Sequence, residues 1–226
     1  MEPFKNPPTL KNIVGTYPDA AHIAEAVMSG GQFAKQAIAT QWLSEGVPYA
    51  FKDAPLIYES VRLWLSIQLD VEPKSINITG SARLGQSLSP KQLGKKFGLH
   101  SDLDFFIVSE SLFSRIKDEF KQWYADYYSE VVKPRNDNEA GFWRDNAIRG
   151  ERNLARGFID AKIIPNLEPY RWTREISQTL WLLSKRLEVT TGAPQVKNMS
   201  IRCYKTWNDF ITQTFLNVDY SSHQGQ

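Results

Sequence analysis

The sequence has very little cysteine: Cys203 is the only one among 226 residues. A single thiol can form no intramolecular disulfide and no cysteine-based zinc cluster. The fold must therefore rest on a hydrophobic core, and the 42% of hydrophobic residues is enough to build one. A lone thiol also fits a reducing compartment, so we expect the protein to be cytoplasmic.

Long apolar runs and a strong net charge are also missing. No segment approaches the ~20 apolar residues that a membrane span needs, and the first ten residues lack the apolar centre of a signal peptide. We therefore expect no membrane insertion and no export. The 27 basic and 25 acidic residues leave a formal charge of +2, which argues against a protein dedicated to coating DNA.

The spacing of apolar residues predicts an α+β fold. Alternating or continuous apolar residues indicate short strands, whereas apolar residues three and four apart indicate helices. The segment 136–153 is polar and has no clear assignment. Strands are expected over residues 76–79, 103–108, 157–164 and 200–205, and helices over residues 20–29, 32–45, 55–69, 111–132, 173–188 and 206–216.

Acidic residues are absent from the whole segment between Ala82 and Ser101. The same segment carries Arg83 and three lysines, together with three glycines and one proline. This composition predicts a long basic loop between the first two strands.

Three aspartates follow this loop in the sequence, two directly and one in a later strand, in a pattern that points to metal chemistry. Asp102 and Asp104 stand two residues apart at the head of a strand, so their carboxylates point to the same side. Like charges that close are stabilised by a hard divalent cation with oxygen ligands. Asp160 lies in an apolar segment, where an unpaired carboxylate is costly. If its strand lies beside that of Asp104, the three acids can hold two metal ions.

A glycine and a hydroxyl come directly after the first strand, at Gly80 and Ser81. A glycine lets a phosphate approach the backbone closely, and Ser81 adds a backbone amide and a hydroxyl. The ordered set of Gly80, Ser81, Asp102, Asp104 and Asp160 resembles the DNA polymerase β-like nucleotidyltransferase superfamily. The twenty residues between Ser81 and Asp102 are about twice the number found in many members of that superfamily.

The resemblance implies a nucleotidyltransferase core with a small mixed sheet over residues 71–170. An N-terminal arm and helices (residues 1–70) and a C-terminal helical part with a tail (residues 171–226) would pack around it. The implied reaction uses two Mg²⁺ or Mn²⁺ ions and transfers a nucleoside monophosphate from ATP, another NTP or a dNTP to a hydroxyl. Gly80 and Ser81 would contact the triphosphate, and the three aspartates would bind the metals, with Asp160 also helping to deprotonate the acceptor.

Other cations near these residues are weaker candidates for phosphate contact. Arg83, Lys95 and Lys96 lie in the basic loop, where solvent exposure is the alternative. Lys185 lies on a helix where the superfamily often places a triphosphate-binding lysine, and a salt bridge is the alternative. His100 is a candidate for contact with the nucleotide or an ordinary turn residue.

Within the superfamily, the layout is most similar to the nucleotidyltransferases of the bacterial Hailong antiphage system. That resemblance implies antiviral defence, in which the enzyme extends its own tail tyrosine into an oligonucleotide that signals to a membrane effector protein. Tyr220 is the matching residue, and anchoring of the last helix is its alternative role. Two further readings stay open: transfer onto a protein or tRNA within a toxin-antitoxin pair, and a catalytically inactive binding module of the same fold.

Overall fold

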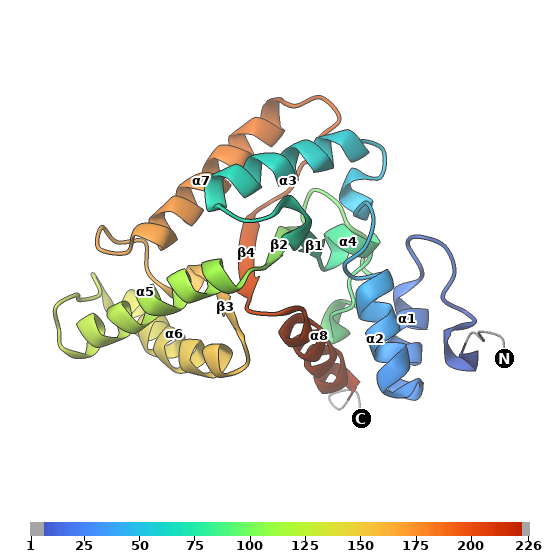
Figure 1. Ribbon diagram of the computed structural model, residues 1–226, viewed down its shortest axis with the longest axis horizontal. Coiled ribbons are helices and arrows are strands. Elements are labelled where there is room, and N and C mark those ends of the chain that lie inside the picture. Colours follow the sequence, from blue (N-terminus) through green and yellow to red (C-terminus); the bar gives the residue numbers. More distant parts are fainter. Residues whose placement is uncertain (1–6, 223–226) are drawn as a thin grey trace.

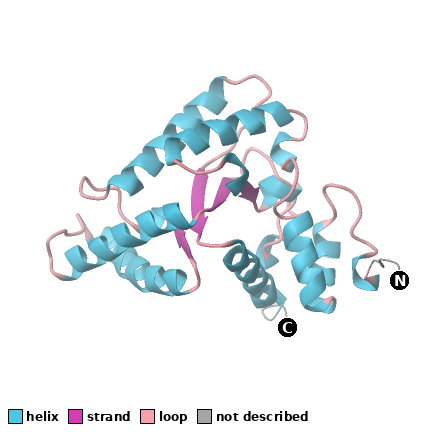
Figure 2. Ribbon diagram, in the orientation of Figure 1, coloured by secondary structure: helices cyan, strands magenta, loops and turns pink. Residues whose placement is uncertain are grey.

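The computed structural model describes residues 7–222, and their secondary structure is α+β (Figures 1 and 2). The strands are β1 (Ile76–Thr79), β2 (Leu103–Val108), β3 (Phe158–Asp160) and β4 (Met199–Tyr204). The α-helices are α1 (Ala20–Ser29), α2 (Gly31–Gln41), α3 (Pro55–Leu69), α4 (Ser81–Leu84), α5 (Glu110–Tyr128), α6 (Asp137–Ala155), α7 (Arg171–Val189) and α8 (Trp207–Ser222). Single 3₁₀ turns occur at Pro8–Leu10, Tyr49–Phe51, Pro73–Ser75, Pro90–Gln92 and Ala161–Ile163.

The four strands form one mixed sheet in the order β1-β2-β4-β3. β1 is antiparallel to β2, β2 is parallel to β4, and β3 is antiparallel to β4. β4 is the last strand in the chain, yet it lies between β2 and β3. The expectation that the strand of Asp160 could lie beside that of Asp104 is therefore wrong, because strand order depends on contacts that are distant in sequence.

Successive side chains along each strand point to opposite sides of the sheet, so the sheet has two different faces. One face is apolar and carries Phe105 of β2 and Ile201 of β4, which belong to the main core with α3, α5 and α7. The opposite face carries Asp104 and Phe106 of β2 and Arg202 of β4. Helix α8 covers part of this second face by stacking Phe210 on Phe106, with ring centroids 4.1 Å apart. The rest of the face is left to polar side chains.

Several helices begin at a side chain that caps them. Asp19 accepts a hydrogen bond from the Ala21 amide at α1, and Ser109 accepts one from the Leu112 amide at α5. Such caps satisfy amides that have no partner within the helix. At α8, the hydroxyl of Thr206 and the carboxylate of Asp209 each accept a hydrogen bond from the other's backbone amide, which forms a capping box.

The short helix α4 was not predicted, and helix α6 is the one long helix, among the described residues, that apolar spacing did not reveal. Its N-cap, Asn136, accepts a hydrogen bond from the amide of Glu139, whose carboxylate in turn accepts one from the amide of Arg135. Only three of its residues are buried, so its apolar stripe is thin: Trp143, Ala147 and Gly150. Gly150 lies against Phe120, and a Cβ at this position would come within 2.1 Å of the ring.

Most predicted elements match the observed ones, but several details differ. The helices expected to end at residues 45 and 132 end at Gln41 and Tyr128. The strand expected over residues 157–164 ends at Asp160, because Ala161–Ile163 forms a 3₁₀ turn. Helix α8 continues to Ser222, beyond the expected end at residue 216. Trp181 belongs to the apolar spacing of α7, yet it is 60% exposed.

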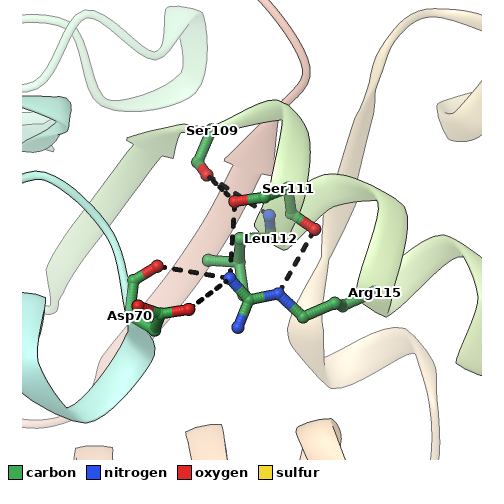
Figure 3. Close-up of polar contacts among 5 residues, drawn as sticks. All are labelled: Asp70, Ser109, Ser111, Leu112 and Arg115. Carbon is green, nitrogen blue, oxygen red and sulfur yellow. Dashed lines mark hydrogen bonds and ion pairs between the residues drawn. The ribbon is translucent and has the colours of Figure 1, made fainter.

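Arg115 connects the end of α3 to α5 (Figure 3), and it also contacts α7. Its Nη2 donates to the carbonyl and the carboxylate of Asp70, at the C-terminus of α3, both at 3.2 Å. Its Nε donates to the carbonyl of Ser111 in the first turn of α5. The guanidinium also lies 4.5 Å from the ring centroid of Trp172 in α7. Asp70 has a left-handed φ of 53°, and this contact helps to hold it there.

Among residues 7–222, no helix combines the length and the apolar character that crossing a membrane requires.

Candidate active site

A cavity of about 520 Å³ lies on the polar face of the sheet. Its walls come from the end of β1 and the turn after it, from the segment between α4 and β2, from β2, β3 and β4, and from α8. It brings together five of the predicted site residues: Gly80, Ser81, Asp102, Asp104 and Asp160.

The turn after β1 faces the acids directly. Gly80 has φ 70° and ψ −151°, a backbone conformation that is essentially restricted to glycine. A Cβ placed on Gly80 would lie 3.9 Å from Oδ2 of Asp104, so the turn and this carboxylate are neighbours. Ser81 then begins the short helix α4. A group bound at Asp104 would therefore also meet the backbone of this turn.

Asp102 lies immediately before β2, Asp104 is the second residue of β2, and the two differ in exposure. Asp102 is exposed and accepts a hydrogen bond from Nδ2 of Asn198 at 3.2 Å. Asp104 is half-buried, and its Oδ1 accepts a short hydrogen bond from the hydroxyl of Ser200 on β4. Each carboxylate thus has one neutral donor and keeps further lone pairs for another ligand.

Asp160 has a different partner. Nε of Arg202 donates to Oδ1 of Asp160 at 2.6 Å, and Nη2 donates to Oδ2 at 3.2 Å. This is a two-pronged ion pair between β4 and β3, and both side chains are about one-third exposed. Burial acts to lower the pKa of Arg202, but the Asp160 carboxylate outweighs it, so the net shift of that pKa is upward.

The register of the sheet separates Asp160 from Asp104. Asp104 pairs with Ser200, whereas Asp160 pairs with Arg202, two residues further along β4. Two strand spacings across the sheet and two residues along it correspond to about 12 Å between the two Cα atoms. Among the described residues, no three His, Cys, Asp or Glu side chains are close enough together to hold one metal ion.

This geometry fits a divalent cation at Asp102 and Asp104 but not at all three acids together. The two carboxylates of β2 supply the hard oxygen ligands that Mg²⁺ and Mn²⁺ prefer. Asp160 could join them only by leaving Arg202 and by a shift of β3 or β4.

The basic segment between α4 and β2 forms a narrow hairpin rather than an open loop. The amide of Ser87 donates to the carbonyl of Lys95, and Gln86 pairs with Lys96 as an isolated antiparallel bridge. At its base, Phe97 contacts Tyr49 edge to face. Lys95 and Lys96 are exposed and line the cavity, as does His100, so this hairpin faces the acids with positive charge.

Two predicted phosphate-binding cations do not line the cavity. Arg83 is 2% exposed, and its guanidinium donates to the carbonyls of Trp42 and Gly46, both at 2.8 Å. It therefore ties α4 to the segment after α2. Lys185 lies on α7, the helix that packs on the opposite face of the sheet, and it forms an exposed ion pair with Glu188. The salt bridge considered for Lys185 is the arrangement observed.

The predicted primer, Tyr220, lies in the last turns of α8, and its side chain falls outside the part of the chain that the structure describes. Thr214 of the same helix lines the cavity. Six residues of α-helix correspond to about 9 Å, so the backbone of Tyr220 follows Thr214 at that distance along the helix.

Ser200 and Arg202 are the site residues that the sequence reasoning did not single out. They alternate with buried Ile201 and Cys203, so both point to the polar face of the sheet. The signal was present in the alternation of Ser200, Arg202 and Tyr204 along one predicted strand. This alternation shows that the three side chains share a face, but their position beside Asp104 and Asp160 depends on the strand order.

Comparison of the chain with protein-family models, with curated protein sequences and with solved structures finds no match.

Proposed function

We propose that this protein is a metal-dependent nucleotidyltransferase, which transfers a nucleoside monophosphate from an NTP or a dNTP to a hydroxyl acceptor. One observation carries the proposal: the Gly80 turn lies against Asp104 in a cavity whose other wall carries Lys95 and Lys96. A triphosphate needs a close backbone approach and positive charge, and its metal needs carboxylate oxygens. All three requirements meet in one cavity.

Each side chain then has a defined task. Asp102 and Asp104 would hold the divalent cation, which supplies charge neutralisation between the carboxylates and the triphosphate. The amides and hydroxyl at Gly80 and Ser81 bind phosphate oxygens, and the hairpin lysines orient the phosphate chain. A bond forms between the acceptor oxygen and the α-phosphorus, the bond to pyrophosphate breaks, and the acceptor proton passes to Asp160 once its ion pair with Arg202 has opened.

The test is a transfer assay with each labelled NTP and dNTP in the presence of Mg²⁺ or Mn²⁺. We expect release of pyrophosphate together with labelled oligonucleotide or labelled protein. Asp104→Asn should abolish both, whereas Asp118→Asn, on the outer part of α5, should leave them unchanged. If Asp102→Asn and Asp104→Asn retain full activity, the proposal is wrong.

The ion pair between Asp160 and Arg202 favours a second candidate, a binding module that performs no transfer. A carboxylate occupied by a guanidinium in two-pronged geometry is not available as a proton acceptor until the pair opens. This candidate predicts binding of a nucleotide without release of pyrophosphate under any metal.

We also propose, as the finer form of the function, a role in antiviral defence with a membrane effector protein as partner. Under this proposal the acceptor is Tyr220 itself, whose hydroxyl would have to enter the cavity. Tyr220→Phe should then abolish covalent self-labelling, while transfer of the nucleoside monophosphate to an added acceptor, with release of pyrophosphate, persists. Self-labelling that survives in Tyr220→Phe excludes this residue as the primer.

A further inference from the structure

A second cavity, of about 550 Å³, lies on the other side of Asp160. It is bounded by α6, by the 3₁₀ turn after β3 and by β4. The two cavities share Asp160, Ser200 and Arg202. The ion pair between Asp160 and Arg202 therefore forms the partition between them, and a group bound in either cavity can reach this pair.

The second cavity has an excess of positive charge. Lys162 and Arg149 line it, and neither forms an ion pair within residues 7–222; Arg149 contacts only a backbone carbonyl and the amide oxygen of Asn146. The acids of this cavity are already bound, because Asp160 pairs with Arg202 and Glu139 pairs with Arg135. The cavity therefore suits an anion.

An aromatic ring lies at the edge of the same cavity. Phe142 is 65% exposed although it belongs to a helix whose neighbouring Trp143 is 3% exposed. Phe142, Asn146 and Arg149 are spaced by four and three residues, so they lie on one face of α6. Nδ2 of Asn146 donates to the carbonyl of Ile163 at 2.9 Å, which holds this face against the turn after β3. An exposed ring beside unpaired cations is the pattern of a surface that stacks a base and binds its phosphates.

We propose that the second cavity binds the acceptor strand, a single-stranded oligonucleotide whose terminal hydroxyl points to Asp160. This inference rests on the proposed function, because it assigns the donor nucleotide to the first cavity and leaves the second for the acceptor. No residue of α8 lines the second cavity among those described, so its contents are independent of the helix that carries Tyr220. The acceptor assigned to this cavity is thus a nucleic acid strand, an acceptor distinct from the one proposed for Tyr220.

The test measures binding alone, without a metal or a donor nucleotide. Fluorescein-labelled six-nucleotide DNA and RNA strands are titrated with the full chain at low salt in EDTA, and anisotropy is recorded. We expect Phe142→Ala to weaken binding about 5-fold or more, since stacking of a base on one ring contributes at least about 1 kcal/mol. We expect Arg149→Glu to weaken binding about 10-fold. The slope of log affinity against log salt concentration should become shallower by about one.

Matched controls are available on the same helix. Arg144 is exposed and does not line the cavity, so Arg144→Glu makes the same charge change and should alter binding less than about twofold. The control for Phe142→Ala is Ile148→Ala, which truncates another apolar side chain of α6. Ile148 is 55% exposed. Thermal unfolding of each variant shows whether the substitution has disturbed the fold.

The outcomes separate the inference from the proposed function. If Arg149→Glu and Arg144→Glu weaken strand binding equally, the inference is wrong. The inference is also wrong if the chain labels itself but binds neither strand, and in that case the proposed nucleotidyltransferase function still holds. Binding that depends on Phe142 and Arg149 in a chain that transfers no nucleotide supports this cavity while the proposed function fails. The relative affinity of the DNA and RNA strands identifies which of the two is the acceptor.

Discussion

Arg202 donates hydrogen bonds to both carboxylate oxygens of Asp160, and this pair stands between the two cavities on the polar face of the sheet. The pair joins β4 to the edge strand β3. Asp104, in contrast, is bound by the neutral hydroxyl of Ser200. The three acids of the site are therefore in two different electrostatic states, one already neutralised by a cation and two still open to one.

The first prediction concerns this ion pair. Arg202→Gln leaves the Asp160 carboxylate one-third exposed without its cation, and we expect the free energy of unfolding to fall by about 1–2 kcal/mol. A double-mutant cycle with Asp160→Asn, measured by urea unfolding, should give a coupling energy of about 1 kcal/mol. The more exposed pair of Arg171 and Glu175 is the control, and we expect its coupling energy to be smaller because solvent screens it. Equal coupling for the two pairs would contradict this prediction.

The second prediction concerns the backbone of Gly80. Gly80→Ala forces a side chain into a conformation that only glycine adopts easily, at a cost of about 1–3 kcal/mol. The added methyl group would meet only ordinary contact with Asp104, so the damage comes from the altered turn. We expect nucleotide affinity, measured by calorimetry, to fall more than stability alone explains.

Gly15 provides the comparison for Gly80. Its φ of 74° is also left-handed, but nothing lies within 4 Å of an added Cβ. Gly15→Ala should cost about 1 kcal/mol in unfolding and leave nucleotide affinity unchanged. If Gly80→Ala and Gly15→Ala lose nucleotide affinity equally, the turn at Gly80 has no specific role in nucleotide binding.

The third prediction concerns Glu119, a carboxylate that is 7% exposed on α5. It accepts hydrogen bonds from the amides of Trp172 and Thr173 and from the hydroxyl of Thr173, and so caps the start of α7 from another helix. Glu119→Ala leaves these donors buried without a partner, and we expect a loss of about 2–4 kcal/mol in unfolding free energy. Glu175→Ala, on the exposed side of α7, should cost less than about 0.5 kcal/mol. A similar small cost for Glu119→Ala would show that water replaces the carboxylate.

The fourth prediction concerns alkaline pH. Burial raises the pKa of Tyr58 from 10.0 to about 12. The folded protein therefore holds the proton of Tyr58 more tightly than the unfolded chain does. The contribution of this proton to the free energy of unfolding is fully present below pH 10 and is lost as the pH rises from 10 to 12. Urea unfolding at pH 9 and pH 11 should show this decline, and Tyr58→Phe should reduce it by roughly 1–2 kcal/mol. An identical decline in the variant would assign the effect to other groups.

The local elements of this fold could be predicted from the sequence because their signals are local. The strands 76–79 and 103–108 and the helices 20–29 and 55–69 were predicted with the observed bounds. Helix α6 was missed because its apolar stripe is thin, although Asn136 and Glu139 carry a capping pattern. Propensity and capping act over a few residues, so they can be recognised without knowledge of the tertiary fold.

The arrangement of the site was harder to predict from the sequence. Alternation along β2 correctly placed Asp102 and Asp104 at the head of one strand, and the turn at Gly80 lies beside them. The position of β4 between β2 and β3 is a long-range property that no local pattern encodes, and it decides that Arg202 is the partner of Asp160. The burial of Arg83 has the same origin, because its acceptors, Trp42 and Gly46, lie far away in the sequence.

The central place of β4 also determines when a growing chain can acquire its site. Until residue 204 has been synthesised, β2 has one open edge and β3 has no strand to pair with. Parallel pairing between distant segments is slow, so we expect the sheet to close late, after most of the helices have formed. The two carboxylates of β2 and the ion pair of β3 would then come together in one step, and a ribosome-bound intermediate would not yet contain the assembled cavity.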